Sequence, residues 1–355
     1  MPSFRTLRVE EILLTRRGLQ RVRLDDDSRA YVLTQLIGDV SVGDDVVVNT
    51  TAVELGLGTG GWHVVHWNLS RRELDAPGRG HIMKVRYTSL QVDAGSAEEL
   101  LDSDSDSDSA LPDLGGVPVL VGSLHSQLGV ALAAAHTERP DWRVSYVMTD
   151  GAALPLAMSD LVADLDRRGW LAGTITAGHA FGGDLEAVSV PSALQLAVHE
   201  QRADLVIVAM GPGVVGTGRA LGTTAIEVAA IAVSAAQLGA RPIVIVRASS
   251  ADDRARHRGI SHHTRTSLAL TPVAVDVALP PELADAGRTL GRTLAPHRVQ
   301  IIDPGDVAAM LGANELVVTT MGRGPHDDPL SFRSVAAAAL LAARSSTVEG
   351  TVCAE

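Results

Sequence analysis

Cysteine, lysine and aromatic residues are all scarce in this chain of 355 residues. Its single cysteine, Cys353, lies close to the C-terminus, which excludes a disulfide framework, a cysteine-based zinc site and a thiol nucleophile set in a core. Lys84 is the one lysine among 30 basic residues, and only 3% of the residues are aromatic. Functions that depend on stacked aromatic platforms or lysine-rich stripes are therefore disfavoured.

Positive charge and long apolar runs are also in short supply. The chain has 42 acidic residues and a formal net charge of -12, which opposes binding to nucleic acid or to an anionic membrane. The longest apolar stretches, residues 225–236 and 335–343, are interrupted by Glu227 or too short to span a bilayer of about 30 Å. No apolar signal segment opens the chain, so we expect a cytoplasmic protein that binds neither nucleic acid nor membrane.

What is present indicates a globular chain of more than one domain. Hydrophobic residues make up 46% of the sequence, close to the average for folded proteins. Residues 1–79 predict a small β-barrel of the OB or SH3-like kind, because five short runs rich in β-branched residues are separated by turn signals. The expected strands are Val9–Thr15, Gln20–Leu24, Arg29–Leu33, Asp45–Asn49 and Trp62–Trp67.

Residues 80–116 have a different composition and are expected to connect two domains. Aspartate and serine alternate from Asp102 to Asp108. Like charges at this density repel one another and stay solvated, and the positions that a calcium loop requires are missing. The run therefore predicts a disordered surface insertion.

From residue 117 onward, continuous apolar runs of strand length alternate with helix-like stretches. Strands buried on both faces of a parallel sheet have this pattern. Residues 117–345 therefore predict a doubly wound, mostly parallel α/β domain, followed by a tail at 346–355. The expected strands are Val117–Val121, Arg143–Met148, Ala172–Ala177, Asp204–Met210, Pro242–Val246, Val273–Val277, Arg298–Ile302 and Glu315–Thr319.

Polar side chains follow these strands at the edge where their carboxyl ends meet, which is where open parallel sheets bind ligands. Imidazole and carboxylate groups suit acid/base chemistry near neutral pH, and a shared metal is the alternative for the same groups. The acid/base candidates are His125, Asp150, His179 and Asp184. Ser123 and Gln127 are candidates for ligand binding. A serine hydrolase is disfavoured because G-x-S-x-G is absent.

A glycine-rich stretch follows the strand Asp204–Met210. Its backbone N–H groups, placed before a helix, would hold a phosphate or a carboxylate, and a tight turn without a ligand is the alternative. The candidate anion-binding residues are Gly211, Gly213, Gly216, Thr217 and Gly218.

The same stretch contains G-x-G-x-x-G but fits dinucleotide binding poorly. The helix is expected only near Thr224, and no acidic residue ends a strand about twenty residues further on. Arg247, Ser249 and Ser250 could take a 2′-phosphate, which keeps NADP as an alternative. Glu227 completes the pattern Thr224-Ala225-Ile226-Glu227, and we expect it to cap the helix rather than to act in catalysis.

The segment Arg254–Arg265 is strongly basic within an acidic chain. Arg254 and Arg258 are expected to pair with the negative charge of a ligand, and His262 and His263 are further ligand-binding candidates. Adjacent histidines share a metal only in loop geometry, and the helical pairs H-x-x-x-H and H-E-x-x-H are missing. We therefore assign no metal ligand and identify no cofactor. A metal site and a loop without a role are the alternatives.

Together, these motifs resemble a bacterial family catalogued as a domain of unknown function, DUF3866. The segments that carry the resemblance are Gly80–Thr88, Ser123–Gln127, Met148–Ala152, Gly178–Asp184, Met210–Gly218 and Gly259–Thr264. The resemblance implies that these segments belong together, and it names no activity.

The sequence thus predicts an enzyme that acts on a small phosphate- or carboxylate-bearing metabolite, held between the glycine-rich stretch and the basic segment. A non-catalytic ligand-binding or regulatory protein built on the same cleft is the main alternative. A third hypothesis is a homodimer formed through the barrel and the apolar helix after Glu227.

Overall fold

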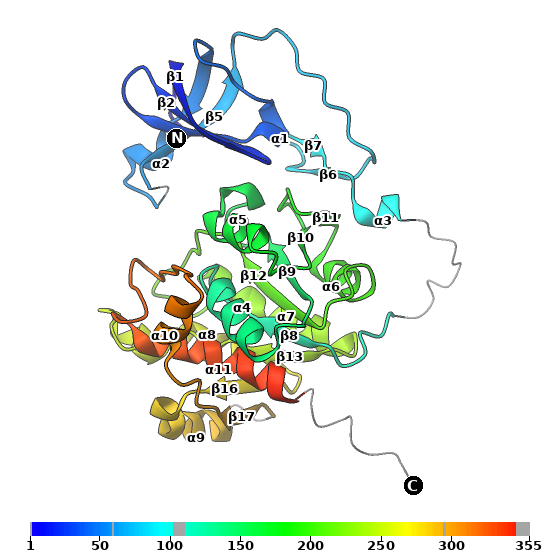
Figure 1. The fold of residues 1–355 in the computed structure, drawn as a ribbon, viewed down its shortest axis with the longest axis vertical. Coiled ribbons are helices and arrows are strands. Elements are labelled where there is room, and N and C mark those ends of the chain that lie inside the picture. The colour runs from blue at the N-terminus through cyan, green and yellow to red at the C-terminus, as the bar shows by residue number, and fades with distance from the viewer. Residues whose placement is uncertain (1, 59, 102–110, 294–295, 346–355) are drawn as a thin grey trace.

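The structure is a computed structural model, and it describes residues 2–58, 60–101, 111–293 and 296–345. A small barrel and a larger α/β domain follow one another along the chain (Figure 1). The predicted insertion at Asp102–Asp108 and the tail at 346–355 lie outside the described residues. Within the described part of the chain, no helix is both long enough and apolar enough to cross a membrane.

The N-terminal unit is a closed barrel of five strands, as predicted. The elements are β1 (Phe4–Arg16), β2 (Leu19–Leu24), β3 (Arg29–Val32), α1 (Thr34–Ile37), β4 (Asp45–Asn49), α2 (Thr51–Glu54) and β5 (Trp62–Asn68). The order β1-β2-β3-β5-β4, with β3 parallel to β5 and β1 closing against β4, is that of an OB-fold. Alternate side chains point inward, and Val22, Val46 and Val48 are fully buried there.

A two-stranded hairpin connects the barrel to the α/β domain. It consists of β6 (Met83–Lys84) and β7 (Val92–Asp93), and the short helix α3 (Ala97–Leu100) follows. The ammonium of Lys84 lies 2.8 Å from the carbonyl oxygen of Thr176, 2.6 Å from that of Ala180 and 2.7 Å from Glu186 Oε2. All three N–H donors are used and the side chain is 2% exposed. The single lysine therefore anchors the connecting segment to the sheet, and we call this contact the Lys84 anchor.

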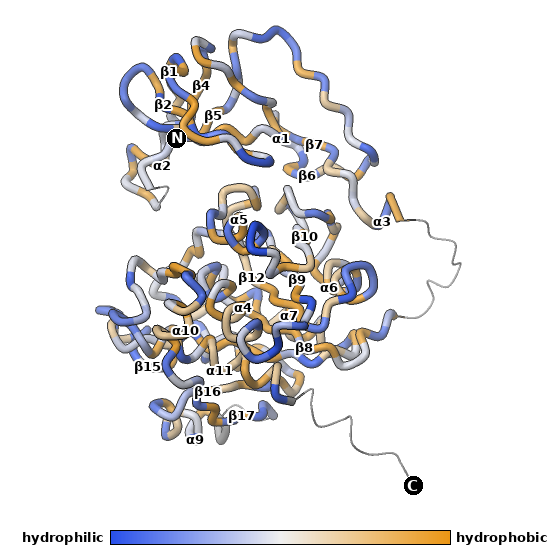
Figure 2. Tube along the Cα trace, in the orientation of Figure 1, coloured by the Kyte–Doolittle hydropathy of each residue, from blue (hydrophilic) through white to orange (hydrophobic). Residues whose placement is uncertain are grey.

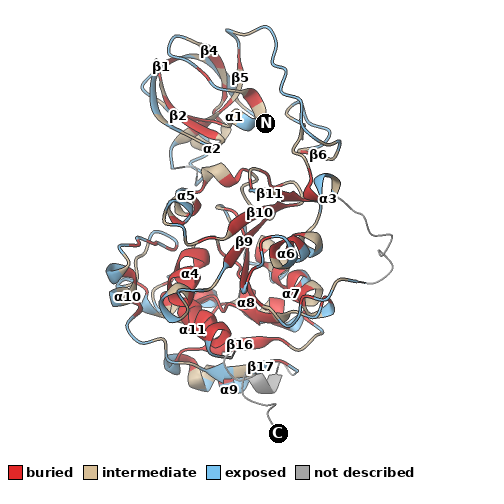
Figure 3. Cartoon of the chain, turned by 45° about the vertical axis from the view of Figure 1, so that its right-hand side comes forward, coloured by how far each residue is buried: buried red, intermediate tan, exposed pale blue. Residues whose placement is uncertain are grey.

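The α/β domain is built on an all-parallel sheet of eight strands. They are β8 (Pro118–Val121), β9 (Val144–Thr149), β10 (Gly173–Ala177), β11 (Leu185–Ala187), β12 (Leu205–Met210), β13 (Arg241–Val244), β16 (Asp276–Leu279) and β17 (Arg298–Ile301). Their order is β11-β10-β9-β12-β8-β13-β16-β17. Every residue of β8, β9, β10 and β12 is buried, which explains their continuous apolar runs (Figures 2 and 3).

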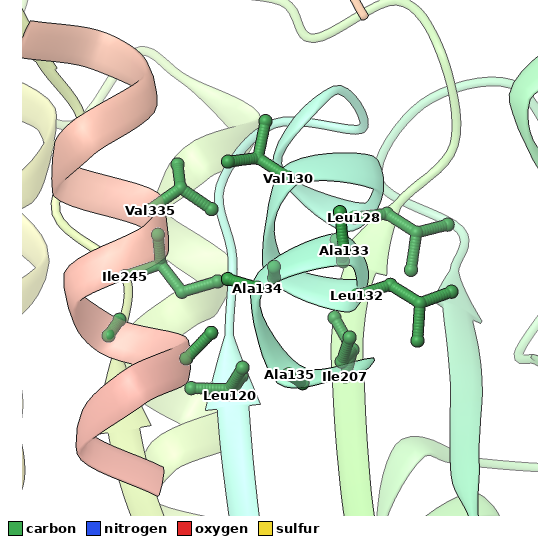
Figure 4. Packing of buried hydrophobic residues seen from close by; sticks show 14 of the residues in the cluster. Leu120, Leu128, Val130, Leu132, Ala133, Ala134, Ala135, Ile207, Ile245 and Val335 are labelled. Atoms are coloured by element: carbon green, nitrogen blue, oxygen red, sulfur yellow. The ribbon is translucent and has the colours of Figure 1, made fainter. Parts of the chain in front are cut away.

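Helices cover both faces of the sheet. The helices α4 (Gln127–Glu138), α5 (Asp160–Arg167), α10 (Val307–Ala313) and α11 (Pro329–Ser345) pack on one face. The helices α6 (Val190–His199), α7 (Glu227–Gln237), α8 (His262–Ala269) and α9 (Ala284–Thr293) pack on the other. Figure 4 shows Ala134 and Val130 of α4 beside Val335 of α11, where the small alanine side chains let the two helices approach closely. The doubly wound α/β domain is confirmed.

Two details of the predicted sheet are wrong. Glu315–Thr319 is not a strand, although Leu316 and Val318 are 5% exposed and Val317 is 87% exposed. This extended segment packs Val318 against Gly129 of α4 instead of pairing with a neighbour, so alternate burial alone produced the strand-like pattern. The short strand β11, with three residues, was not predicted.

Candidate functional site

The strand order reverses between β8 and β12 at the carboxyl edge of the sheet. From β8 the chain continues to β9, β10 and β11 on one side, and from β12 it continues to β13, β16 and β17 on the other. The helices α4 and α7 cover opposite faces, so the loops after β8 and β12 diverge and leave a crevice. A pocket of about 540 Å³ lies there. Its lining includes Leu124, His125, Ser126, Pro212, Gly213, Val214, Val317, Met321 and Gly58 of the barrel.

His125 is fixed at this pocket by two hydroxyl groups. Its Nδ1 lies 3.2 Å from the hydroxyl of Tyr146, and its Nε2 lies 2.7 Å from Ser159 Oγ. Ser159 is the N-cap of α5 and accepts a hydrogen bond from the N–H of Val162. Burial lowers the pKa of His125 to about 4. The imidazole is therefore uncharged at neutral pH.

Glu227 does not cap its own helix, contrary to our expectation. The cap contact comes from Thr223, whose Oγ1 accepts from the N–H of Ala225. The carboxylate of Glu227 instead crosses to β9, where its Oε1 accepts a 2.8 Å hydrogen bond from Thr149 Oγ1. Burial raises the pKa of Glu227 to about 7. The hydrogen bond from Thr149 acts in the opposite direction, and the charge of Asp150 raises the pKa further. Such a carboxyl can both take and give a proton near neutral pH.

Asp150 and His179 lie beside one another after β9 and β10. Asp150 is exposed, and its Oδ2 accepts a 3.0 Å hydrogen bond from the backbone N–H of His179. A Cβ on Gly178 would lie only 2.4 Å from the same oxygen, and the φ of 66° at this residue favours glycine at the turn. The ring of His179 faces the connecting segment, where its Nδ1 accepts from the N–H of Val85. The structure thus brings Asp150 and the backbone of His179 together, but the imidazole points elsewhere.

Asp184 is not at the carboxyl edge with the other candidates. The chain doubles back between His179 and Asp184, so Asp184 Oδ2 accepts from both the N–H and the hydroxyl of Thr174, near the start of β10. Its Oδ1 pairs with Arg17 of the barrel at 2.7 Å. Asp184 therefore contributes to the contact between the barrel and the sheet rather than to the predicted acid/base group.

The glycine-rich stretch forms a hairpin instead of an anion cradle before a helix. Gly216 pairs with Thr223 across the hairpin. The N–H of Val215 donates to Thr224 Oγ1, and that of Thr217 donates to the carbonyl of Gly222. These N–H groups are therefore already used. The remaining predicted glycines, Gly211, Gly213 and Gly218, lie at the base and along the exposed part of the same hairpin.

The hairpin contacts a cluster of three histidines. A Cβ on Gly216 would lie 3.1 Å from Cε1 and 3.4 Å from Nε2 of His263. The ring of His263 packs against those of His257 and His262, with centroids 4.9 Å and 4.3 Å apart. Burial and the charge of Arg247 lower the pKa of His257 to about 4 and that of His263 to about 3. We call His257, His262 and His263 the histidine cluster; all three lie in the basic segment Arg254–Arg265, and only His262 and His263 were predicted to bind a ligand.

The arginines of the basic segment differ in their availability. Arg254 is bound to Asp252 through Nε at 2.9 Å and Nη2 at 2.8 Å, so its charge is already compensated. Hydrogen bonds from Arg254 hold the pKa of Asp252 well below its ordinary range. Arg258 is exposed and donates to the backbone carbonyl of Asp252. The buried arginine is Arg247, whose Nη1 lies 3.2 Å from Nδ1 of His263.

The remaining ligand-binding candidates have mixed environments. Gln127 is 4% exposed, and its Oε1 accepts from the N–H groups of Ser123 and Leu124, so it stabilises the turn after β8. The Oγ of Ser123 is buried and has no hydrogen-bond partner among the described residues. Ser249 and Ser250 both donate to the buried carboxylate of Asp328. A 2′-phosphate beside them would face that negative charge, which weakens the NADP alternative.

Three features of the candidate site were not predicted from the sequence. The contact between Glu227 and Thr149 spans 78 residues, and no local pattern encodes it. His257 joins the cluster because the short helix η3 (Ala255–His257) and the turn at Gly259, with φ of 62°, bring it back to the start of α8. Arg247 was considered only as an NADP contact. The apolar run that ends at Val246 predicted that Arg247 follows a strand. It did not predict that the side chain of Arg247 is buried.

Fold and site together define an α/β protein with an OB-like barrel and a pocket at the switch point of a parallel sheet. Its family model is described as protein of unknown function (DUF3866), and it matches residues 29–339. The chain belongs to this family, which confirms the resemblance of its motifs. No curated protein sequence matches the chain.

Proposed function

We propose that the protein is an enzyme that acts on a small metabolite carrying a phosphate or carboxylate group, bound at the carboxyl edge of the sheet. The environment of Arg247 is the observation that carries the proposal. Its side chain is buried, with the residue 7% exposed, and it has no ion pair within the part of the chain that the structure describes. A buried charge without a counter-charge is costly, and an anionic ligand would remove that cost.

The surroundings of Arg247 favour the same kind of ligand. Burial and the charge of Arg254 lower the pKa of Arg247 to about 10, so the guanidinium remains charged at neutral pH. Arg323 and Arg256 add positive potential, and the charge of Asp252 opposes them. A small anion is attracted to such a site even in a protein whose net charge is negative.

Glu227 and Asp150 supply the proton chemistry in this proposal. Gly151 lies so close to Glu227 that a Cβ there would be 2.7 Å from Oε2, which places the loop after β9 against the carboxyl. One carboxyl is partly buried with a raised pKa and the other is exposed. Two carboxyl groups in different environments can divide the roles of acid and base.

The test is a thermal-shift screen of inorganic phosphate and of small phosphorylated and carboxylated metabolites on the full chain. A ligand at 100 times its Kd adds about 2.7 kcal/mol, which raises Tm by several degrees. Arg247→Met should remove the shift. Arg256→Met, which removes an exposed charge from the same region, should keep most of it.

Turnover is then measured on the compounds that stabilise the protein, by mass spectrometry of the products. We expect Glu227→Gln to keep the thermal shift and lose turnover. The anion site is wrong if no anion stabilises the wild type or if Arg247→Met retains the full shift. Binding without any conversion would favour the non-catalytic alternative.

A further inference from the structure

The histidine cluster has the arrangement of a metal site. One nitrogen from each of the three rings lies within 4.8 Å of the other two. His257 and His263 are 2% and 3% exposed, so the rings meet in the interior rather than on the surface. Three uncharged imidazoles whose nitrogens lie this close together can form few hydrogen bonds with one another. A cation, in contrast, can bind a lone pair from each of the three rings.

The buried nitrogens lack other partners. Nε2 of His262 and Nε2 of His263 are both inaccessible to water, and neither has a hydrogen-bond partner among the residues that the structure describes. A buried polar atom left without a partner costs about 1–3 kcal/mol. Two such atoms in one cluster point to a ligand that binds to both.

Ser261 positions the cluster in the way that outer groups position metal-bound histidines. Its Oγ lies 2.8 Å from Nδ1 of His257 and accepts a hydrogen bond from the N–H of His263, as the N-cap of α8. A proton on Nδ1 of His257, donated to this oxygen, leaves the lone pair on Nε2 for a metal. Ser261 is completely buried, so the contact has no competition from water.

We propose that His257, His262 and His263 bind one divalent transition metal ion, with zinc as the first candidate, and that its open fourth position takes the anionic group of the substrate. The metal site stands on the geometry of the cluster, whereas the anion at the fourth position rests on the function proposed above. Three histidines without cysteine or carboxylate ligands suit zinc, and three protein ligands with an open position are typical of catalytic zinc sites.

Arg247 couples the two parts of this proposal. A guanidinium only donates, so in the metal-free arrangement Nδ1 of His263 accepts from Arg247 and the ring proton lies on Nε2. Coordination through Nε2 requires the proton on Nδ1, which breaks this hydrogen bond. Metal binding therefore releases Arg247, and an anion at the fourth position gives the guanidinium a new partner next to Gly216.

The metal is tested with Co²⁺ on full-length protein that has been stripped with a chelator. We expect one ion per chain and the visible absorption of four-coordinate cobalt. His262→Ala should weaken binding by more than about 100-fold, and Ser261→Ala by about 10–100-fold, because Ser261 acts through His257. The control is His199→Ala, an exposed histidine at the end of α6, which should bind cobalt like the wild type. Tm of each metal-free variant shows whether it has folded.

Inorganic phosphate then distinguishes this proposal from the proposed function. Phosphate should change the cobalt spectrum of the wild type, and Arg247→Met should keep cobalt but lose the phosphate response. Cobalt binding that is equal in wild type and His262→Ala would overturn the metal site. Phosphate stabilisation of metal-free wild type and His262→Ala to the same extent would overturn the role of the metal in anion binding, while leaving the proposed anion site intact.

Discussion

Replacing Glu227 by glutamine should stabilise the protein at alkaline pH while it abolishes turnover. The amide keeps an oxygen that can accept the hydrogen bond from Thr149 Oγ1, and it removes a carboxylate that the fold holds in a partly buried position. A residue whose removal improves stability but destroys activity is typical of a functional site, because the fold tolerates an unfavourable group there.

The magnitude follows from the pKa of Glu227, which burial raises from 4.5 to about 7. The fold therefore favours the protonated carboxyl. The contribution of this protonated carboxyl to the free energy of unfolding is fully present below about pH 4.5, is lost as the pH rises, and is gone above about pH 7. One pH unit of this titration is worth 1.36 kcal/mol, so the full loss is about 3 kcal/mol, or about 2 kcal/mol once partial exposure to water is allowed for.

Thermal unfolding at pH 5 and pH 8 tests this prediction. At pH 8, Glu227→Gln should have a Tm about 4–8 °C above that of the wild type, since 1 kcal/mol shifts Tm by about 2–4 °C in a domain of this size. The advantage should nearly disappear at pH 5. Glu200→Gln, at an exposed glutamate after α6, should change stability by less than about 0.5 kcal/mol at either pH. An equal effect of Glu227→Gln at both pH values would refute the argument from burial.

Three further substitutions test other parts of the structure. Lys84→Arg should cost about 3 kcal/mol in urea unfolding, because the 2% exposed ammonium has three short contacts that a planar guanidinium cannot reproduce; an unchanged midpoint would contradict this. His125, with a pKa that burial lowers from 6.5 to about 4, contributes stability that is lost as the pH falls between these values, so any stability advantage of the wild type over His125→Asn should shrink as the pH falls from 6.5 to 4. Because Glu227 acts in the opposite direction over part of this range, each variant must be compared with the wild type at every pH. Gly216→Ala should weaken phosphate binding measured by calorimetry, since its Cβ would lie 3.1 Å from the ring of His263, and should change Tm by no more than about 3 °C; unaltered binding would place the ligand elsewhere.

The fold was largely predictable because burial leaves a clear pattern in this sequence. Leu205–Met210 is apolar without interruption because both of its faces are covered, and the valines of β4 alternate because only one side faces the barrel interior. The segment Glu315–Thr319 was misread because a chain that packs on a helix can also bury every second residue. Periodicity reports burial, and it does not report the hydrogen-bonded neighbour that defines a strand.

The site was predictable only as far as strand ends determine it. His125, Asp150 and Gly213 lie at the predicted edge because each follows a buried strand. Asp184 was misplaced because its chain turns back after Gly178, with φ of 66°, and a turn of this kind carries little information about where it leads. The residues Thr224 to Glu227 have the spacing of a capping box, but the carboxylate of Glu227 accepts its hydrogen bond from Thr149 of β9 instead of from its own helix terminus.

The Lys84 anchor allows chemical labelling to monitor the junction between the barrel and the sheet. Lys84 is the one side-chain primary amine in the sequence. While its ammonium is bound to Thr176, Ala180 and Glu186, an amine-directed reagent cannot reach it. The rate at which Lys84 becomes labelled therefore measures how often the connecting segment detaches. Comparing that rate with global unfolding would show whether the barrel separates from an intact α/β domain, without any engineered probe.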